Sequence, residues 1–155
     1  MRKLDRIDRN ILRILQNDGR ISYTELADNV GLSTTPCIER VRRLEKEKFI
    51  EGYYARLNPK ILGFDMLVFV EIALSYQSPD AFETFNEAVK LLPYVQECHL
   101  VSGDSDYLLK ARIRDMSEYR ALLGEMLLTL PGVKNSKSYI VMEEVKEGVG
   151  LPIKT

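Results

Sequence analysis

Apolar residues in the first part of the chain recur every three or four positions, in three segments separated by breaks. This spacing places them on one side of an α-helix. The first segment runs from Asp5 to Gln16 and is broken by Asp18-Gly19. The second follows Ser22, which has Glu25 three residues later, the spacing of a capping box, and it ends at Gly31, a residue suited to a left-handed cap. We therefore predict two short helices here, and a third after them.

The third segment combines an apolar stripe with basic residues. We expect Ser33 to cap a helix that extends to about Lys48, with Pro36 tolerated in its first turn. The buried stripe is predicted to comprise Cys37, Ile38, Val41 and Leu44. The opposite side is predicted to carry Glu39, Arg40, Arg43 and Lys46, with Arg42 between the two sides. Two short helices joined by a glycine turn, the second bearing arginines, are typical of a helix-turn-helix that binds DNA.

The residues after this helix predict a small wing. A strand-like segment around Gly52 contains the apolar side chains Phe49, Ile50, Tyr53, Tyr54 and Leu57. We expect these side chains to form the floor of the helical domain rather than to stack on bases, because a short turn must be packed to hold its shape. The pattern thus predicts an N-terminal winged helix-turn-helix domain over residues 1–57.

The apolar pattern changes after Asn58-Pro59, because proline interrupts regular strand pairing. Beyond a linker at residues 58–65, short apolar runs alternate with amphipathic helical segments. The predicted elements are a strand at 66–76, a helix from Pro79, strands at 94–101 and 107–113, a helix at 117–130 and a strand at 133–142. This βαββαβ order is that of a ferredoxin-like sandwich. The chain is therefore predicted to be α+β, with a sheet domain at 66–142 and a C-terminal tail at 143–155.

Helices on one face of a four-stranded sheet leave its other face uncovered. The first strand is apolar on both sides, with Val68, Val70 and Ile72 on one side and Leu67, Phe69 and Ala73 on the other. A large exposed apolar face is rarely left to water, so two chains are expected to bury it against each other. Such a homodimer would also present two reading helices to DNA.

Charge is distributed unevenly along the chain, which has a net charge of −1. Residues 1–57 contain 12 Lys and Arg against 9 Asp and Glu, whereas residues 58–155 contain 10 against 14. Phosphate is attracted to the basic N-terminal third and repelled by the acidic remainder, so DNA is expected to bind at one end only, and weakly to one copy. The basic helix also has a simpler interpretation, as a solvated face whose arginines are balanced by nearby glutamates.

Residues suited to enzyme chemistry are sparse. Cys37 and Cys98 are the only cysteines and His99 is the only histidine, which is too few for a zinc site. Cys98 and His99 would point to opposite faces of a strand and could not act as nucleophile and base. No segment is long enough to cross a membrane and the N-terminus does not resemble a secretory signal, so we expect a cytoplasmic protein that is not an enzyme.

Two alternatives remain open from the residues alone. Ferredoxin-like folds serve many functions, so the second domain could belong to an amino-acid-binding enzyme subunit. The chain could also be an architectural DNA-binding protein that has no effector. Binding of free amino acids, and footprints at specific promoters, would distinguish a regulator from both.

Four strings are more specific than a lone helix-turn-helix. They are LDRIDRNIL at 4–12, TPCIERVRRLE at 35–45, ECHLVSGDSDYLLK at 97–110 and VMEEVK at 141–146. Together they resemble the Lrp/AsnC (feast/famine) family of bacterial and archaeal transcription regulators, over almost the whole chain. The resemblance implies a nucleoid-associated regulator without a cofactor, whose ACT-like RAM domain forms homodimers that assemble into a higher oligomer, an octamer. It also implies that a small amino acid, leucine or methionine, binds between domains of adjacent dimers.

The resemblance further implies an effector-binding site. The matching residues are Val101, Ser102, Gly103, Asp104, Ser105 and Asp106, together with Tyr139 on the last strand. A zwitterion needs an acceptor for its ammonium group, which Asp104 or Asp106 could supply, and donors for its carboxylate, which the amides around Ser102 and Gly103 could supply. From the residues alone, SGDSD could also be an ordinary hairpin turn.

The helix-turn-helix supplies the predicted DNA contacts. Ser33 at the helix N-terminus suits a phosphate, and Thr34, Thr35, Arg40 and Arg43 suit groove and phosphate contacts. The full set predicted to contact double-stranded DNA is Ser33, Thr34, Thr35, Cys37, Glu39, Arg40, Arg43 and Lys46.

Overall fold

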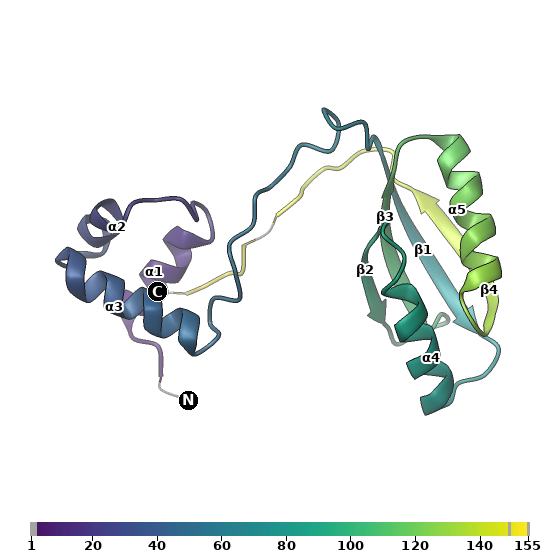
Figure 1. The fold of residues 1–155 in the computed structure, drawn as a ribbon, viewed down its shortest axis with the longest axis horizontal. Helices are drawn as coiled ribbons and strands as arrows, with labels where there is room; N and C mark the ends of the chain where they lie inside the picture. Colours follow the sequence, from purple (N-terminus) through teal and green to yellow (C-terminus); the bar gives the residue numbers. More distant parts are fainter. Residues whose placement is uncertain (1–2, 149, 155) are drawn as a thin grey trace. The chain divides into compact units, whose positions relative to one another are not determined.

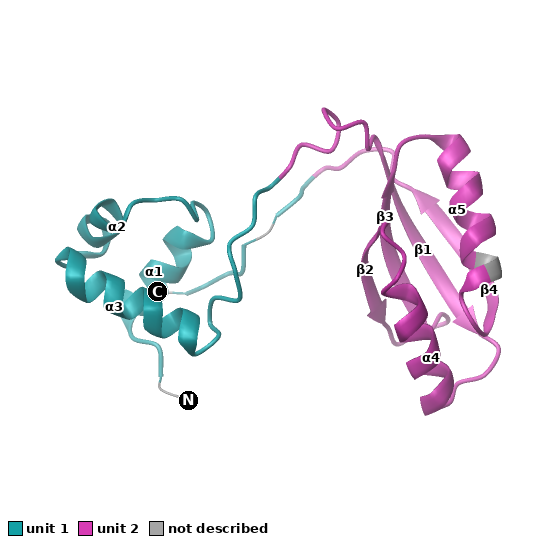
Figure 2. Ribbon diagram, viewed as in Figure 1, with its two compact units in different colours: residues 1–56, 146–155 teal, residues 57–145 magenta. Residues whose placement is uncertain are grey.

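The computed structural model describes residues 3–148 and 150–154. Residues 1 and 2, in the predicted first domain, and residues 149 and 155, in the predicted tail, lie outside the described residues. The chain divides into two compact units, which Figure 2 distinguishes by colour. The helical unit comprises residues 1–56 and 146–155, and the sheet unit comprises residues 57–145.

The helical unit contains the three predicted helices. They are α1 Arg6–Leu15, α2 Tyr23–Val30 and α3 Thr34–Lys46 (Figure 1). A complete capping box begins α1, because the Asp8 amide donates to the Asp5 carboxylate at 2.8 Å and the Asp5 amide donates to the Asp8 carboxylate at 3.2 Å. The Ser22 hydroxyl accepts from the Glu25 amide, and Gly31 ends α2 with φ of 70°. These signals confirm the predicted start of α1 and the predicted start and end of α2.

The core of the helical unit is small and lies between the three helices. It is formed by the fully buried side chains Ile11, Leu26, Ala27, Cys37, Val41 and Leu44. Ala27 of α2 and Cys37 of α3 are small, which permits the close approach of the two helices.

The predicted wing is wrong. Residues 49–57, all of which are described, contain no strand. Phe49 and Ile50 pack against the helical core, and the Tyr53 hydroxyl donates to Glu45 at 3.0 Å. Tyr54 and Leu57, however, are 89% and 67% exposed. The apolar pattern alone could not make a strand here, because a strand needs a neighbouring strand with which to exchange hydrogen bonds.

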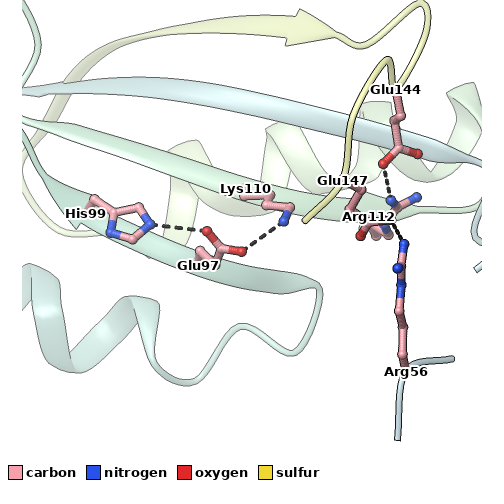
Figure 3. Close-up of polar contacts among 7 residues, drawn as sticks. All are labelled: Arg56, Glu97, His99, Lys110, Arg112, Glu144 and Glu147. Atoms are coloured by element: carbon pink, nitrogen blue, oxygen red, sulfur yellow. Dashed lines mark hydrogen bonds and ion pairs between the residues drawn. The ribbon is translucent and has the colours of Figure 1, made fainter. Parts of the chain in front are cut away.

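The end of the chain packs within the helical unit. The Gln16 side-chain nitrogen donates to the Leu151 carbonyl at 3.1 Å. The Gln16 side-chain oxygen accepts from the Leu151 backbone amide at 3.0 Å. Arg56 forms an ion pair with Glu147 at 2.7 Å (Figure 3). The last part of the predicted tail is therefore held by specific contacts.

The sheet unit has the predicted order of elements. They are β1 Met66–Leu74, α4 Pro79–Val89, β2 Val95–Leu100, β3 Tyr107–Ile113, α5 Met116–Thr129 and β4 Val133–Ile140 (Figure 1). The four strands are paired antiparallel in the order β2-β3-β1-β4. This is the topology of the ferredoxin-like sandwich, so the predicted fold class is confirmed.

One face of the sheet is covered by α4 and α5. Its central strand contributes Val68, Val70 and Ile72, all fully buried. They pack with Phe85 and Leu122, from the two helices, in a larger core. The alternation along β1 thus directs one set of side chains to the helices, as period-two patterning requires.

The other sheet face is not the large apolar patch that was predicted. Phe69 lies between Lys110 and Tyr139 of the neighbouring strands, and Glu71 lies between Leu108 and Lys137. The premise of the predicted dimer contact is therefore wrong, because the strands on either side of β1 place charged side chains beside its apolar ones. The homodimer itself stays a prediction.

Charged side chains on this face form ion pairs with neighbouring residues. Glu97 of β2 accepts from Lys110 of β3 at 2.8 Å and contacts His99 at 3.2 Å, while Arg112 pairs with Glu144 at 2.5 Å (Figure 3). The bond from Lys110, and then that from His99, holds the pKa of Glu97 below its ordinary value. The Glu97–Lys110 pair joins neighbouring strands, and cross-strand pairs of this kind stabilise a sheet.

In the part of the chain that the structure describes, no helix has the length and apolar character needed to span a membrane.

Candidate functional sites

The solvent side of α3 carries a row of polar side chains. Thr35, Glu39, Arg42 and Lys46 are all exposed and are spaced at intervals of four, three and four residues. These intervals place them on one side of the helix. We call these four residues the outward row. Three of them were predicted to contact DNA, but Arg42 was not, although a turn of about 100° per residue would have shown that it lies near Glu39 and Lys46.

Arg40 and Arg43 lie elsewhere than predicted. Instead of pointing away from the protein, both guanidinium groups contact Asp8 of α1, at 2.8 and 2.6 Å. Arg40 also binds Asp5 at 2.6 Å. The Asp8 side chain is only 3% exposed, whereas those of the two arginines are 26% and 28% exposed. The helical wheel of α3 could not reveal this pairing, because the acidic partners belong to another helix.

These contacts shift the pKa values of Asp5 and Arg40 so that the charged form of each side chain is favoured. The hydrogen bond from the Asp8 amide, followed by that from Arg40, lowers the pKa of Asp5. The bonds to Asp5 and Asp8 raise the pKa of Arg40. The charged forms of both side chains are therefore stabilised in the folded protein.

Two further predictions at the helix-turn-helix need correction. Cys37 is fully buried in the helical core, so it cannot contact DNA. Burial also raises the pKa of its thiol. Ser33 occupies the N-cap position of α3, but its hydroxyl makes no capping hydrogen bond within the described residues. Ser33 is exposed and Thr34 is half-buried, so both lie at the N-terminal end of α3 as predicted.

A hollow of about 400 Å³ lies in the sheet unit beside the loop between β2 and β3. Its lining contains most of the predicted effector residues: Val101, Ser102, Gly103, Asp104, Ser105 and Tyr139. It also contains three residues that were not predicted, Glu71, Leu108 and Lys137. These three come from the strands beside the loop, and only the pairing of β1 with β3 and β4 brings them together.

Opposite charges meet in this hollow. The Glu71 carboxylate accepts from the Tyr139 hydroxyl at 3.2 Å and from the Ser105 hydroxyl at 3.4 Å. The Lys137 ammonium lies 5.1 Å from the centre of the Tyr139 ring. Contact with Tyr139, and then the charge of Glu71, raises the pKa of Lys137. The hollow therefore presents both an anionic and a cationic group to a small molecule.

Asp106 does not line the hollow. Its carboxylate accepts from the Leu74 amide and from the Gln77 side-chain amide, each at 2.7 Å, and it is 8% exposed. Asp106 thus anchors the base of the loop, and Asp104 is the aspartate that lines the hollow. Gly103 has φ of 150°, a backbone conformation that side-chain-bearing residues rarely adopt.

Comparison with protein families identifies both domains of the chain. Residues 4–45 match the AsnC-type helix-turn-helix domain, and residues 67–151 match the Lrp/AsnC ligand binding domain. The chain belongs to the Lrp/AsnC family. Over 98% of its length it is 64% identical to the leucine-responsive regulatory proteins of Escherichia coli strain K12 and Klebsiella pneumoniae, and it covers 93% of each.

Solved structures agree with this assignment. A transcriptional regulator from Neisseria meningitidis in complex with L-methionine is 33% identical, with a TM-score of 0.92 and coverage of 97% of both chains. A feast or famine regulatory protein from M. tuberculosis complexed with L-methionine is 32% identical, with a TM-score of 0.87 and coverage of 98% and 100%.

The chain is therefore a DNA-binding transcription regulator with an amino-acid ligand-binding domain, and not an enzyme. The predicted family and general function are confirmed. The individual contact residues remain predictions.

Proposed function

We propose that the hollow beside the β2–β3 loop binds the zwitterion of a small apolar amino acid, leucine or methionine, as an effector of DNA binding. The observation that carries this proposal is the presence of Glu71 and Lys137 in one hollow with the exposed loop backbone. A zwitterion needs groups of both signs within a few ångströms. The volume of about 400 Å³ falls in the range of small-molecule sites.

The groups in the hollow suggest a role for each part of the ligand. Glu71 and Asp104 would accept hydrogen bonds from the ammonium group, and Lys137 would attract the carboxylate, with the amides around Gly103 as further donors. Leu108 offers an apolar surface to the side chain of the ligand. The relatives solved in complex with L-methionine support this class of ligand.

We further propose that the protein acts as homodimers assembled into an octamer, in the cytoplasm and associated with the nucleoid, with the effector between sheet domains of adjacent dimers. The family resemblance supports this arrangement. The rim of the hollow is also suited to a neighbouring copy, because Leu100 is 61% exposed and the adjacent Val101 is 36% exposed.

On double-stranded DNA, we propose that Ser33 and Thr34 contact phosphates at the N-terminal end of α3 and that the outward row enters the major groove. Arg42 and Lys46 supply the positive charge of this surface. Glu39 could accept a hydrogen bond from a cytosine amino group.

Isothermal titration calorimetry of the whole protein with L-leucine, L-methionine and other amino acids tests the effector site. We expect saturable heat from leucine or methionine, and affinity at least roughly ten-fold weaker in Glu71→Gln, because a charge-assisted hydrogen bond is lost. Glu97→Gln is the matched control, because Glu97 lies outside the hollow and should bind normally. The absence of heat from every amino acid would contradict the effector site and favour an architectural protein.

A further inference from the structure

The salt bridges between α1 and α3 separate the arginines of α3 into two groups. Arg40 and Arg43 are bound to acidic groups of α1, whereas Arg42 is exposed and takes part in none of the ion pairs among the described residues. We infer that Arg40 and Arg43 are positioning residues, which fix the orientation of α3 on α1 through Asp8 and Asp5. The inference rests on the proposed role of α3 in reading DNA, and assigns the direct contacts to the outward row.

The contacts of Arg40 and Arg43 with Asp8 and Asp5 hold α3 at two points, and we call this set of contacts the brace. Arg40 and Arg43 are three residues apart, so their attachment points lie about 4.5 Å apart along the axis of α3. Both converge on one carboxylate oxygen of Asp8, and Arg40 also reaches Asp5. Two attachment points resist rotation of α3 about its own axis, which a single ion pair would permit.

The burial of the Asp8 side chain makes the contacts of the brace important for stability. The apolar contact between α1 and α3 comes from the small core around Ile11, Val41 and Leu44, and such contacts are not directional. Asp8, by contrast, is 3% exposed at its side chain and must keep its partners, because an unpaired buried charge is strongly destabilising. An arginine that left Asp8 to bind a phosphate would leave this carboxylate with fewer partners.

The acidic partners provide a test in which the two roles predict opposite results. If Arg40 contacts DNA directly, removing the charge of Asp5 should free Arg40 and strengthen DNA binding. If Arg40 positions α3, the same change should weaken operator binding. Asp5→Asn suits this test, because Asp5 is 49% exposed at its side chain and asparagine keeps the ability to cap α1.

The experiment is a fluorescence-anisotropy titration of the full chain at several salt concentrations. The probes are a duplex selected by the native protein from random DNA and a scrambled duplex of the same length. The variants are Arg42→Ala, Arg43→Ala, Asp8→Asn and Asp5→Asn. Arg42→Ala and Arg43→Ala are matched, because each removes one positive charge from α3.

We expect Arg42→Ala to weaken binding to both duplexes and to lower the slope of log affinity against log salt by about one for each lost phosphate contact. Arg43→Ala and Asp8→Asn should weaken operator binding roughly ten-fold, with the slope and the affinity for scrambled DNA little changed, because misplaced base contacts reduce specificity rather than phosphate attraction. Asp5→Asn should weaken operator binding by a smaller factor. A loss of fold stability alone would leave the affinity of the folded fraction unchanged, so circular dichroism below the melting transition accompanies each titration.

Two results would overturn the brace while leaving the proposed function intact. One is stronger or equal operator binding by Asp5→Asn, and the other is a slope lowered by Arg43→Ala as much as by Arg42→Ala. If Arg42→Ala also leaves both affinity and slope unchanged, α3 is not the reader, and the proposed DNA contacts fail together with the brace.

Discussion

The two units of this regulator hold their shape by different means. In the described residues, six buried apolar side chains form the core of the helical unit, whereas fourteen form the core of the sheet unit. The helical unit compensates with directional contacts: a capping box on α1, the Asp8 ion pairs and the Gln16 bonds to the end of the chain. The sheet unit also contains buried charges, such as Asp106, but its larger apolar core makes it less dependent on them.

This difference suggests where function and stability overlap. In the helical unit the polar groups that hold the fold adjoin the proposed DNA-reading row, so few substitutions there should affect only one property. In the sheet unit, polar residues around the hollow can change ligand binding while the core remains intact, because the loop lies outside the layer of buried side chains.

A matched pair of core substitutions should produce the largest difference in stability between the two units. Leu44→Ala and Leu109→Ala each remove a fully buried leucine, which costs about 2–5 kcal/mol of unfolding free energy. We expect Leu44→Ala to unfold the helical unit and abolish DNA binding, because its small core has little stability to lose. Leu109→Ala should leave the sheet unit folded at 25 °C. Hydrogen exchange resolved by segment measures both, and equal protection in the two variants would contradict the comparison.

The two aspartates of the β2–β3 loop should differ in a complementary way. Asp106→Ala leaves the buried Leu74 amide without its acceptor, so we expect a loss of about 1–3 kcal/mol in unfolding free energy. Asp104→Asn, at an exposed position, should change stability by less than about 0.5 kcal/mol but weaken amino-acid binding. Thermal unfolding and calorimetry of the two variants provide the check, and a reversed order of effects would show that Asp104, not Asp106, anchors the loop.

The contact between Gln16 and the end of the chain predicts a smaller effect. Gln16→Ala removes two hydrogen bonds at the surface and should cost at most about 1 kcal/mol. We expect limited proteolysis to cut sooner near residue 150 in this variant than in the native protein. An unchanged cleavage pattern would show that the segment is held by other contacts.

The smallest effect is expected from the ionisation of Asp5, which should make the stability of the helical unit depend on pH. Its folded pKa lies below the ordinary value of 3.8, so its stabilising contribution is present above that value and is lost as the pH falls through 3.8 and then through the folded pKa. Unfolding of the helical unit should become easier below about pH 3.8, and less steeply so in Asp5→Asn. Identical pH profiles for the two proteins would exclude this contribution.

Local signals were sufficient to predict most of the fold. The capping pair Ser22 and Glu25, the left-handed Gly31 and the alternation of apolar runs with helical stripes depend on residues close together in sequence. The wing failed because the tyrosines after Ile50 have strand-like composition but no partner strand. The apolar sheet face failed for a related reason, since one strand cannot show what its neighbours place beside it.

The sequence predicted those parts of the two sites that consist of residues close together along the chain. The loop at 101–105 was found from its own residues and the family resemblance, and it lines the hollow with Tyr139. Glu71 and Lys137 were missed because strand pairing, not sequence proximity, brings them there. Arg40 and Arg43 were assigned to the wrong side of α3 because Asp8, thirty-two or more residues away, redirects them.

The central claim is that an amino acid in the hollow of the sheet unit changes DNA binding by the helical unit. The most direct measurement is the dissociation constant for a selected operator with and without saturating L-leucine or L-methionine, in the native protein and in Glu71→Gln. We predict a shift of roughly five-fold or more in the native protein, as is typical of allosteric coupling, and little shift in Glu71→Gln at the same concentration. The same dissociation constant with and without either amino acid in the native protein, or an equal shift in the variant, would contradict the claim.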